Sequence, residues 1–280
     1  MHAFPYFRLF LAGCLVAATA LIVPVAAADD DEDPAESGPT LFAPGGAPPA
    51  GATAPGRVAA CRPATPAVGP TPGRSVTVDR GPQECKTVAL TFDAGADRGY
   101  AELILDILKQ NNIPATFGMT GQWTEQNPDL VQRMVADGHQ LMNHTWSHRS
   151  FTGFSAGRAL NTVERRIELE RTDELIKGLT GFKIGPYFRP PYGDLNDGVL
   201  KDVSDAGYDY TIMWTVDSFG WNNVKAPGIV DRCLSRAGPG VIYLFHVGAQ
   251  SEDALALGAI INGLRGRGLE FVTIADMLGL

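Results

Sequence analysis

From Lys86 onward, the chain alternates between short runs rich in β-branched and aromatic residues and segments whose apolar residues recur at helical spacing. The first unit joins Thr87–Phe92 to a helical segment from Tyr100 to Gln110. Such strands have to run parallel, because each helix carries the chain back to the start of the next strand. About seven strands in roughly two hundred residues favour a distorted (β/α) barrel of the α/β class, with an open doubly wound sheet as the alternative.

The later elements follow the same pattern. Further strands are expected at residues 115–119, 140–142, 187–188, 210–216, 241–245 and 271–274. Further helices are expected at residues 127–136, 155–177, 196–206, 227–236 and 254–265.

The N-terminal region differs from this pattern in composition. Residues 1–28 hold one charge, Arg8, and then an uncharged apolar run that ends in three alanines, which is typical of a signal peptide. The length of the run leaves an uncleaved membrane anchor as the alternative. Residues 29–85 are rich in Pro, Ala and Gly, which predicts a disordered spacer before a folded domain at residues 86–280. We therefore expect an exported protein that is secreted, periplasmic or attached to a membrane through its N-terminus.

Charge and cysteine content limit the partners. The formal net charge is −8, and six acidic residues between Asp29 and Glu36 carry −6 of it, which leaves −2 for the remainder. Without a basic stripe, nucleic acid is not an expected partner. In an oxidising compartment, Cys61 and Cys85 are the favoured disulfide pair because both precede the patterned region, and Cys233 is left over. We expect a monomer.

Polar residues follow the expected strands at their C-terminal ends, where parallel barrels carry their active sites. These residues are Asp93, His144, His148, Arg189, Asp217 and His246. One of them alone could cap a helix, but core packing gives no reason for five strands to place His, Asp and Arg at one rim. The four-residue spacing of His144 and His148 lets both imidazoles bind one ion if the segment is helical or curled.

The order of these segments resembles the polysaccharide deacetylase family, carbohydrate esterase family 4, which is built on the NodB-homology domain. The family shows TFDDG, H-[ST]-x-x-H, R-x-P-[YF], D-x-x-D-W and L-x-H segments. The chain has Thr91-Phe92-Asp93-Ala94-Gly95, His144-Thr145-Trp146-Ser147-His148, Arg189-Pro190-Pro191-Tyr192, Asp217-Ser218-Phe219-Gly220-Trp221 and Leu244-Phe245-His246. The resemblance covers about Lys86 to Leu280. It implies a distorted NodB-like (β/α) barrel and metal-dependent removal of acetyl groups from polymeric sugars.

The resemblance also implies a role for each matching residue. His144 and His148 would bind a divalent metal, zinc by ligand type, with Co²⁺ or Ni²⁺ as alternatives. Asp93 would act as the general base, Arg189 would keep Asp93 ionised, and His246 would protonate the leaving group.

Three further residues would shape the pocket. The backbone N–H of Tyr192 would help to hold the oxyanion. Trp221 and Leu244 would form the wall that accepts the acetyl methyl group, although Leu244 fits an ordinary core position equally well.

Two positions depart from the family pattern. Ala94 stands where the family has its carboxylate metal ligand, and Gly220 stands where it has the aspartate that polarises the catalytic histidine. Asp97, in a loop flanked by Gly95 and Gly99, is the expected substitute for the first loss, with capping of the following helix as the alternative role. Asp217 is the expected partial substitute for the second.

The sequence therefore predicts a metal-dependent polysaccharide deacetylase that acts on N-acetyl groups of peptidoglycan or a chitin-like glycan. An O-acetyl esterase of the xylan type is a variant of this prediction, because the same attack by water cleaves both bonds. A glycan-binding pseudoenzyme with a degraded metal site is the alternative from another functional class.

Overall fold

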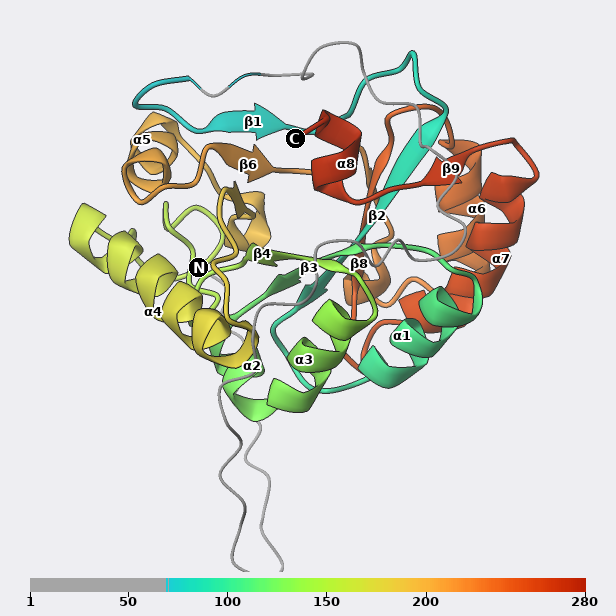
Figure 1. Cartoon of the computed structure of the whole chain (residues 1–280), viewed down its shortest axis with the longest axis horizontal. Coiled ribbons are helices and arrows are strands. Elements are labelled where there is room, and N and C mark those ends of the chain that lie inside the picture. The colour runs from blue at the N-terminus through green and yellow to red at the C-terminus, as the bar shows by residue number, and fades with distance from the viewer. Residues whose placement is uncertain (1–68, 70) are drawn as a thin grey trace, which may run out of the picture. The chain divides into compact units, whose positions relative to one another are not determined.

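The computed structural model describes residue 69 and residues 71–280, so that the expected targeting segment, most of the expected spacer and Cys61 lie outside the described residues. The strands are β1 (Val76–Val78), β2 (Thr87–Ala94), β3 (Thr116–Met119), β4 (Gln140–Asn143), β5 (Tyr187–Phe188), β6 (Tyr210–Ile212), β7 (Val216–Asp217), β8 (Ile242–His246) and β9 (Glu270–Phe271). The α-helices are α1 (Ala101–Gln110), α2 (Gly121–Gln126), α3 (Pro128–Ala136), α4 (Thr162–Thr180), α5 (Asp197–Asp205), α6 (Ala226–Ser235), α7 (Asp253–Arg265) and α8 (Ile274–Leu278), as Figure 1 shows. None of the helices in this described part is long and apolar enough to cross a membrane.

All strand pairs of the sheet are parallel, in the order β1-β6-β5-β4-β3-β2-β8-β7, with β9 paired to β2. β6 lies next to one edge of the sheet and β7 forms the other edge, yet only residues 213–215 separate the two strands. Such a connection spans roughly 14 Å at most, so the two edges must lie close together. The sheet is thus curled into a distorted barrel, which confirms the expected fold class, with nine strands in the described residues rather than about seven.

The expected single strand at 210–216 is interrupted for a physical reason. Arg189 donates hydrogen bonds from Nε to the carbonyl of Ile212 and from Nη2 to the carbonyl of Met213. On one side of this interruption β6 pairs with β1 and β5, and on the other side β7 pairs with β8. A buried side chain from a distant segment therefore divides one apolar run into two strands.

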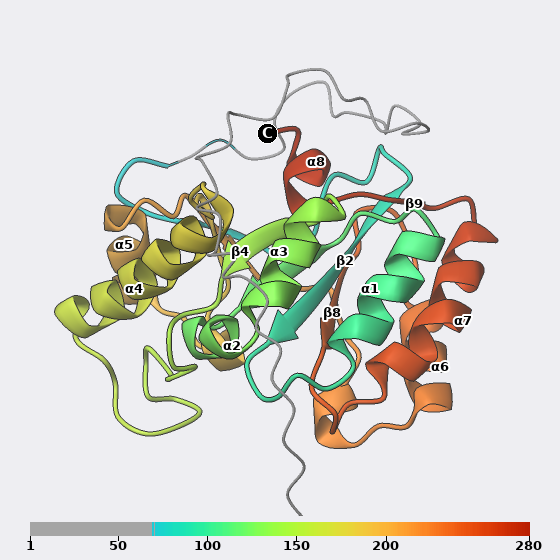
Figure 2. The same ribbon diagram turned by 60° about the horizontal axis from the view of Figure 1, so that its bottom comes forward.

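Alternation along β2 separates its side chains into two sets. Val88, Leu90, Phe92 and Ala94 belong to the large hydrophobic cluster that includes the buried faces of α1, α3 and α7. Figures 1 and 2 show these helices in a row along the outer side of the strands. Asp93 lies between Phe92 and Ala94, so its side chain points to the other face of the strand, toward the interior of the barrel.

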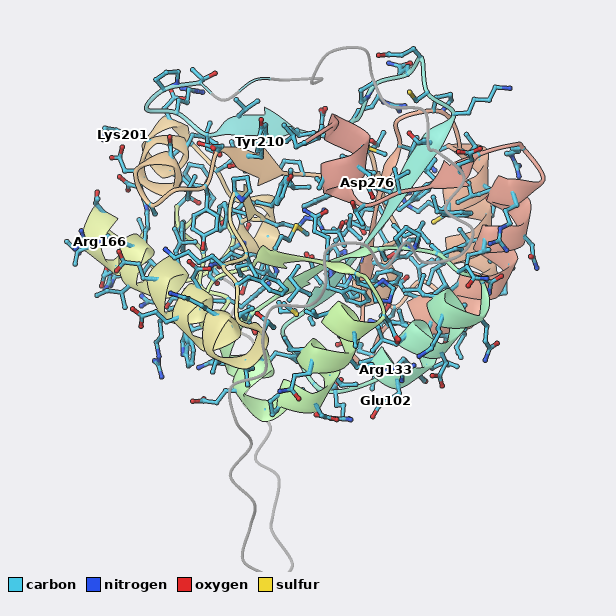
Figure 3. The ribbon with its side chains drawn as sticks, viewed as in Figure 1. Glu102, Arg133, Arg166, Lys201, Tyr210 and Asp276 are labelled. Carbon is cyan, nitrogen blue, oxygen red and sulfur yellow. The ribbon has the colours of Figure 1, made fainter. Side chains whose placement is uncertain are left out.

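The helices turn most of their charged side chains outward. Figure 3 shows Glu102 on α1 and Arg133 on α3 at the outer surface, and Arg133 forms an ion pair of 2.6 Å with Asp106 of α1. Helix α4 begins at Thr162 rather than near residue 155, because Asn161 and Glu164 form a capping box.

The folded domain begins earlier than the sequence predicted. β1 lies within the expected spacer, yet Val76, Thr77 and Val78 pair with Tyr210, Thr211 and Ile212. The hydroxyl groups of Ser75 and Thr211 add a buried hydrogen bond of 2.8 Å. Three residues were too few for a periodic signal, so the boundary at residue 86 is wrong.

The two cysteines within the described residues differ in state. Cys85 is disulfide-bonded, and its expected partner Cys61 lies outside the described residues. Cys233 is a free, buried thiol on α6, as expected for the cysteine left over.

Replacing Val78 by alanine tests whether β1 belongs to the domain. Val78 is 3% exposed and packs in a core cluster with Tyr210 and Ile212, whereas Thr77 is exposed. We expect Val78→Ala to lower the free energy of unfolding in urea by about 2 kcal/mol, and the control Thr77→Ala to change it by less than about 0.5 kcal/mol. Equal, small effects of both changes would contradict the assignment of β1 to the fold.

Candidate active site

The C-terminal ends of the strands open into a cavity of about 580 Å³. The predicted site residues that line it are Asp93, His144, His148, Tyr192, Trp221, Leu244 and His246, and Asp217 lines it as well. These residues come from segments far apart in the sequence, so the parallel sheet brings them together at one rim. Of the other predicted site residues, Arg189 lies in the buried interior at 0% exposure, and Asp97 is not part of the lining.

Asp93 lies at the end of β2 between two neighbouring strands. It is opposite Gly118 of β3 and opposite His246 of β8. A Cβ atom on Gly118 would lie 2.7 Å from Oδ1 of Asp93, which is closer than atoms approach without displacement. Glycine at position 118 therefore leaves the space that the Asp93 carboxylate occupies.

Arg189 holds this carboxylate in its charged form. Nη1 of Arg189 donates a hydrogen bond of 2.9 Å to Oδ1 of Asp93, and Nε2 of His144 lies 3.5 Å from Oδ2. Burial raises the pKa of the Asp93 carboxyl, but the positive charge of Arg189, together with His144 and His246, lowers it more, so that the net pKa lies below its ordinary value. Asp93 is therefore a carboxylate at neutral pH, as a general base requires.

His144 and His148 present neutral imidazoles to the cavity. The carbonyl of Arg189 accepts a hydrogen bond of 2.8 Å from Nδ1 of His144, which leaves Nε2 of that ring with its lone pair. Burial lowers the pKa of His144, and burial together with the neighbouring His144 lowers the pKa of His148 to about 3. The two ring centroids are 4.9 Å apart.

The turn that carries both histidines is held by two side chains that the sequence did not reveal. Glu168 of α4 accepts hydrogen bonds from the backbone N–H groups of Trp146 and Ser147 and from the Ser147 hydroxyl. Oδ1 of Asn143 accepts a hydrogen bond from the backbone N–H of Thr145. These contacts stabilise a turn in which Thr145 and His148 adopt positive φ angles of 69° and 57°, a costly conformation that clusters at functional sites.

Aromatic side chains form the rim of the cavity. Tyr192 is 50% exposed and its ring centroid lies 4.7 Å from that of His148. Trp221 is 48% exposed, and its Nε1 donates to the carboxylate of Asp217. Leu244 is buried and contributes an apolar surface to the cavity, so both readings of Leu244, cavity wall and core residue, apply.

The structure does not bring Asp97 to the two histidines. Oδ1 of Asp97 accepts a hydrogen bond of 2.8 Å from the backbone N–H of Ala249, and the carbonyl of Asp97 accepts one from Trp123. The glycine-flanked loop thus curls toward the segment after β8 instead of toward His144. No group of three or more His, Cys, Asp or Glu side chains in the described residues is placed to hold a metal ion, so the expected role of Asp97 as a third ligand is not supported.

Asp217 does not replace the carboxylate that is missing at position 220. Its Oδ1 accepts a hydrogen bond of 2.7 Å from the backbone N–H of Phe219, and its carboxylate also receives the Trp221 indole. Asp217 therefore shapes the turn after β7. The carboxylate closest to His246 in this region is that of Asp253, which sequence reasoning missed because Asp253 begins a helix and looks like an ordinary N-terminal acid.

The side chains at the site supply two of the three ligands that a catalytic zinc site commonly has. Two neutral imidazoles suit zinc and related ions, and fixing of Nδ1 by a backbone carbonyl is the usual support for a histidine that binds metal through Nε2. A catalytic zinc site commonly has three protein ligands. His144 and His148 supply two, and the methyl group of Ala94 lies in the hydrophobic cluster instead.

Comparison with known proteins adds an independent line of evidence. Residues 80–211 match the sequence profile of the polysaccharide deacetylase family. A peptidoglycan-N-acetylglucosamine deacetylase from Bacillus cereus is 34% identical over 200 residues, which cover 70% of this chain and 70% of that protein.

Two solved structures are similar as well. The family 4 carbohydrate esterase PdaA from Bacillus subtilis superposes with a TM-score of 0.66 at 32% identity, covering 72% of this chain and 84% of that chain. A pseudoenzyme of the same esterase family from Bacillus anthracis has a TM-score of 0.66 at 29% identity, covering 72% and 69%.

Replacing Arg189 by methionine tests its electrostatic role. We expect the pKa of Asp93, followed by ¹³C NMR of its carboxyl group, to rise because the guanidinium no longer offsets burial. Since the folded-state pKa of Asp93 is depressed, Arg189 stabilises the wild-type fold above pH of about 4 and loses this effect as the pH falls further. The free energy of unfolding of Arg189→Met should therefore fall less on acidification than that of the wild type.

The matched control is Arg165→Met, which breaks another largely buried ion pair, between Arg165 and Asp202 at 2.8 Å. Both changes should destabilise the fold by roughly 3–5 kcal/mol, but Arg165→Met should leave the pKa of Asp93 unchanged. An unchanged Asp93 titration in Arg189→Met would contradict the role given to Arg189.

Proposed function

Since the chain belongs to the polysaccharide deacetylase family, we propose that it hydrolyses N-acetyl groups of a peptidoglycan-type glycan, with a divalent metal held by His144 and His148. The observation that carries this proposal is the buried Asp93 carboxylate, which Arg189 keeps ionised and which is the register partner of His246 on the neighbouring strand, with both residues lining one cavity. A buried charge pair costs desolvation free energy. Glycan binding alone gives no reason for that cost, whereas proton transfer to and from a reacting amide does.

The residues divide the reaction between a base and an acid. Asp93 accepts a proton from a water molecule as the water oxygen attacks the acetyl carbonyl carbon. His246 donates a proton to the amide nitrogen as the carbon–nitrogen bond breaks, which gives acetate and a free amine. A divalent ion, most suitably zinc, would polarise the carbonyl and lower the pKa of the attacking water.

The remaining predicted residues bind and orient the substrate. The backbone N–H of Tyr192 would stabilise the developing oxyanion. Leu244 and Trp221 offer an apolar surface to the acetyl methyl group, and the exposed rings of Tyr192 and Trp221 suit the faces of sugar rings. Peptidoglycan is favoured as the substrate because similar enzymes are named for it, and export through the N-terminal segment would deliver the domain to it.

The rival function is glycan binding by a pseudoenzyme. It is favoured by the two-histidine donor set and by the similar fold of a pseudoenzyme of the same esterase family. O-acetyl ester hydrolysis is a variant of the leading proposal that the same groups could perform.

Acetate release decides between these functions. The purified full chain, loaded with Zn²⁺, Co²⁺ or Ni²⁺ and analysed for metal content, should release acetate from peptidoglycan or N-acetylated chitooligosaccharides. Release from acetylated xylan alone would identify an O-acetyl esterase. Glycan binding without acetate release under any of the metals would support the pseudoenzyme.

Histidine variants test the division of roles. His246→Ala should lower turnover by roughly two to four orders of magnitude, the usual effect of losing a positioned acid, with normal metal content. His144→Ala should lose both metal and activity. The control His139→Ala removes another buried histidine, which accepts a hydrogen bond from Ala115 outside the cavity lining, and should keep its metal. Full metal occupancy in His144→Ala would contradict its assignment as a ligand.

A further inference from the structure

Asp253 is a buried carboxylate in contact with His246. It is the first residue of α7 and is 0% exposed. Its Oδ2 accepts hydrogen bonds from the backbone N–H of His246 at 2.8 Å and from the Ser218 hydroxyl at 3.1 Å. Nδ1 of His246 lies 3.8 Å from the same oxygen, which is longer than a hydrogen bond.

Two buried side-chain atoms, one from each of these residues, have no hydrogen-bond partner in the described part of the chain. They are Nδ1 of His246 and Oδ1 of Asp253. Buried polar atoms are rarely left unpaired, and an exception calls for an explanation. Catalytic hydrogen bonds are often long without substrate and tighten when it binds, so a small approach of the imidazole to Oδ2 of Asp253 would give Nδ1 of His246 a partner.

The space that Asp253 occupies is available because residue 220 is glycine. A Cβ atom on Gly220 would lie 2.7 Å from Oδ1 of Asp253 and 2.1 Å from Oγ of Ser251. A side chain at position 220 and the carboxylate of Asp253 therefore exclude each other. The carboxylate of Asp253 thus occupies space that a side chain at position 220 would need.

We propose that Asp253 is the positioning residue of His246 and replaces the carboxylate that is absent at position 220. Its carboxylate accepts a hydrogen bond from Nδ1–H of His246, which fixes the tautomer of the ring and stabilises the imidazolium. Because Nδ1 is the buried nitrogen of a ring that lines the cavity, Nε2 carries the proton that passes to the leaving amine.

The catalytic part of this inference rests on the proposed function, and its test compares two leaving groups. An N-acetyl sugar needs a proton on its amine to leave, whereas 4-nitrophenolate leaves from 4-nitrophenyl acetate without one. We expect Asp253→Asn to lower kcat for an N-acetylated chitooligosaccharide roughly 10- to 100-fold, part of what a positioned acid contributes. KM and hydrolysis of the aryl ester should change less than about threefold.

Ser218→Ala is the matched control, since it removes the other side chain that binds the same carboxylate oxygen without touching the imidazole. It should leave both activities within about threefold of wild type. The double variant Asp253→Asn/His246→Ala should be no slower than His246→Ala, because groups that act as one unit are non-additive. Equal losses on both substrates in Asp253→Asn, or further loss in the double variant, would overturn the proposal and leave Asp253 with a structural role.

A second measurement needs no turnover. In ¹⁵N–¹H NMR spectra, His246 of the wild type should carry its proton on Nδ1 when neutral, and should lose this preference in Asp253→Asn but not in Ser218→Ala. Asp93, His144 and His148, which interact electrostatically with His246, stay the same in all variants. If no acetylated glycan is hydrolysed, the proposed function fails, yet these spectra still test the contact. A His246 spectrum that Asp253→Asn leaves unchanged would overturn the inference by itself.

Discussion

A guanidinium group removed from water needs hydrogen-bond partners, and each of the three nitrogens of Arg189 has one in the interior of the barrel. Its side chain is 0% exposed and donates to the Asp93 carboxylate and to the carbonyls of Ile212, which ends β6, and of Met213, which follows it. The same residue receives the Nδ1–H of His144 at its own carbonyl. One buried residue therefore sets the charge of the candidate base through its side chain, the tautomer of a metal-ligand candidate through its carbonyl, and the point at which β6 ends.

The site depends equally on positions that lack a side chain. Gly118 leaves room for the carboxylate of Asp93, and Gly220 leaves room for that of Asp253. In both places a carboxylate and a Cβ atom compete for the same few cubic ångströms. Each glycine is therefore a requirement of packing against a charged group, and neither sits at a positive φ angle.

The sequence predicted the architecture well wherever the pattern was long. Helices α1, α3 and α7 were predicted to within a few residues, because an amphipathic stripe over three turns is a strong signal. Short elements gave no such signal. β1 has three residues and lies in a Pro-rich and Gly-rich region, and α2 and α8 are hardly longer than one turn. Helix α4 begins where Asn161 and Glu164 form a capping box, whereas the predicted start near residue 155 followed a less specific apolar pattern.

By itself, the sequence determined which residues lie at the C-terminal rim, since strand parity and parallel connections place Asp93, His144, His148 and His246 there. It also determined that two carboxylates are absent from their expected positions. Only the tertiary structure decided whether another carboxylate lies near either position. Asp97 binds the backbone near Ala249 and does not reach the histidines, whereas Asp253 reaches His246 from the start of α7. The reason is physical: strand parity is a local property of the chain, but the volume beside a buried imidazole is shared among segments far apart in sequence, and their packing alone decides which side chain fills it.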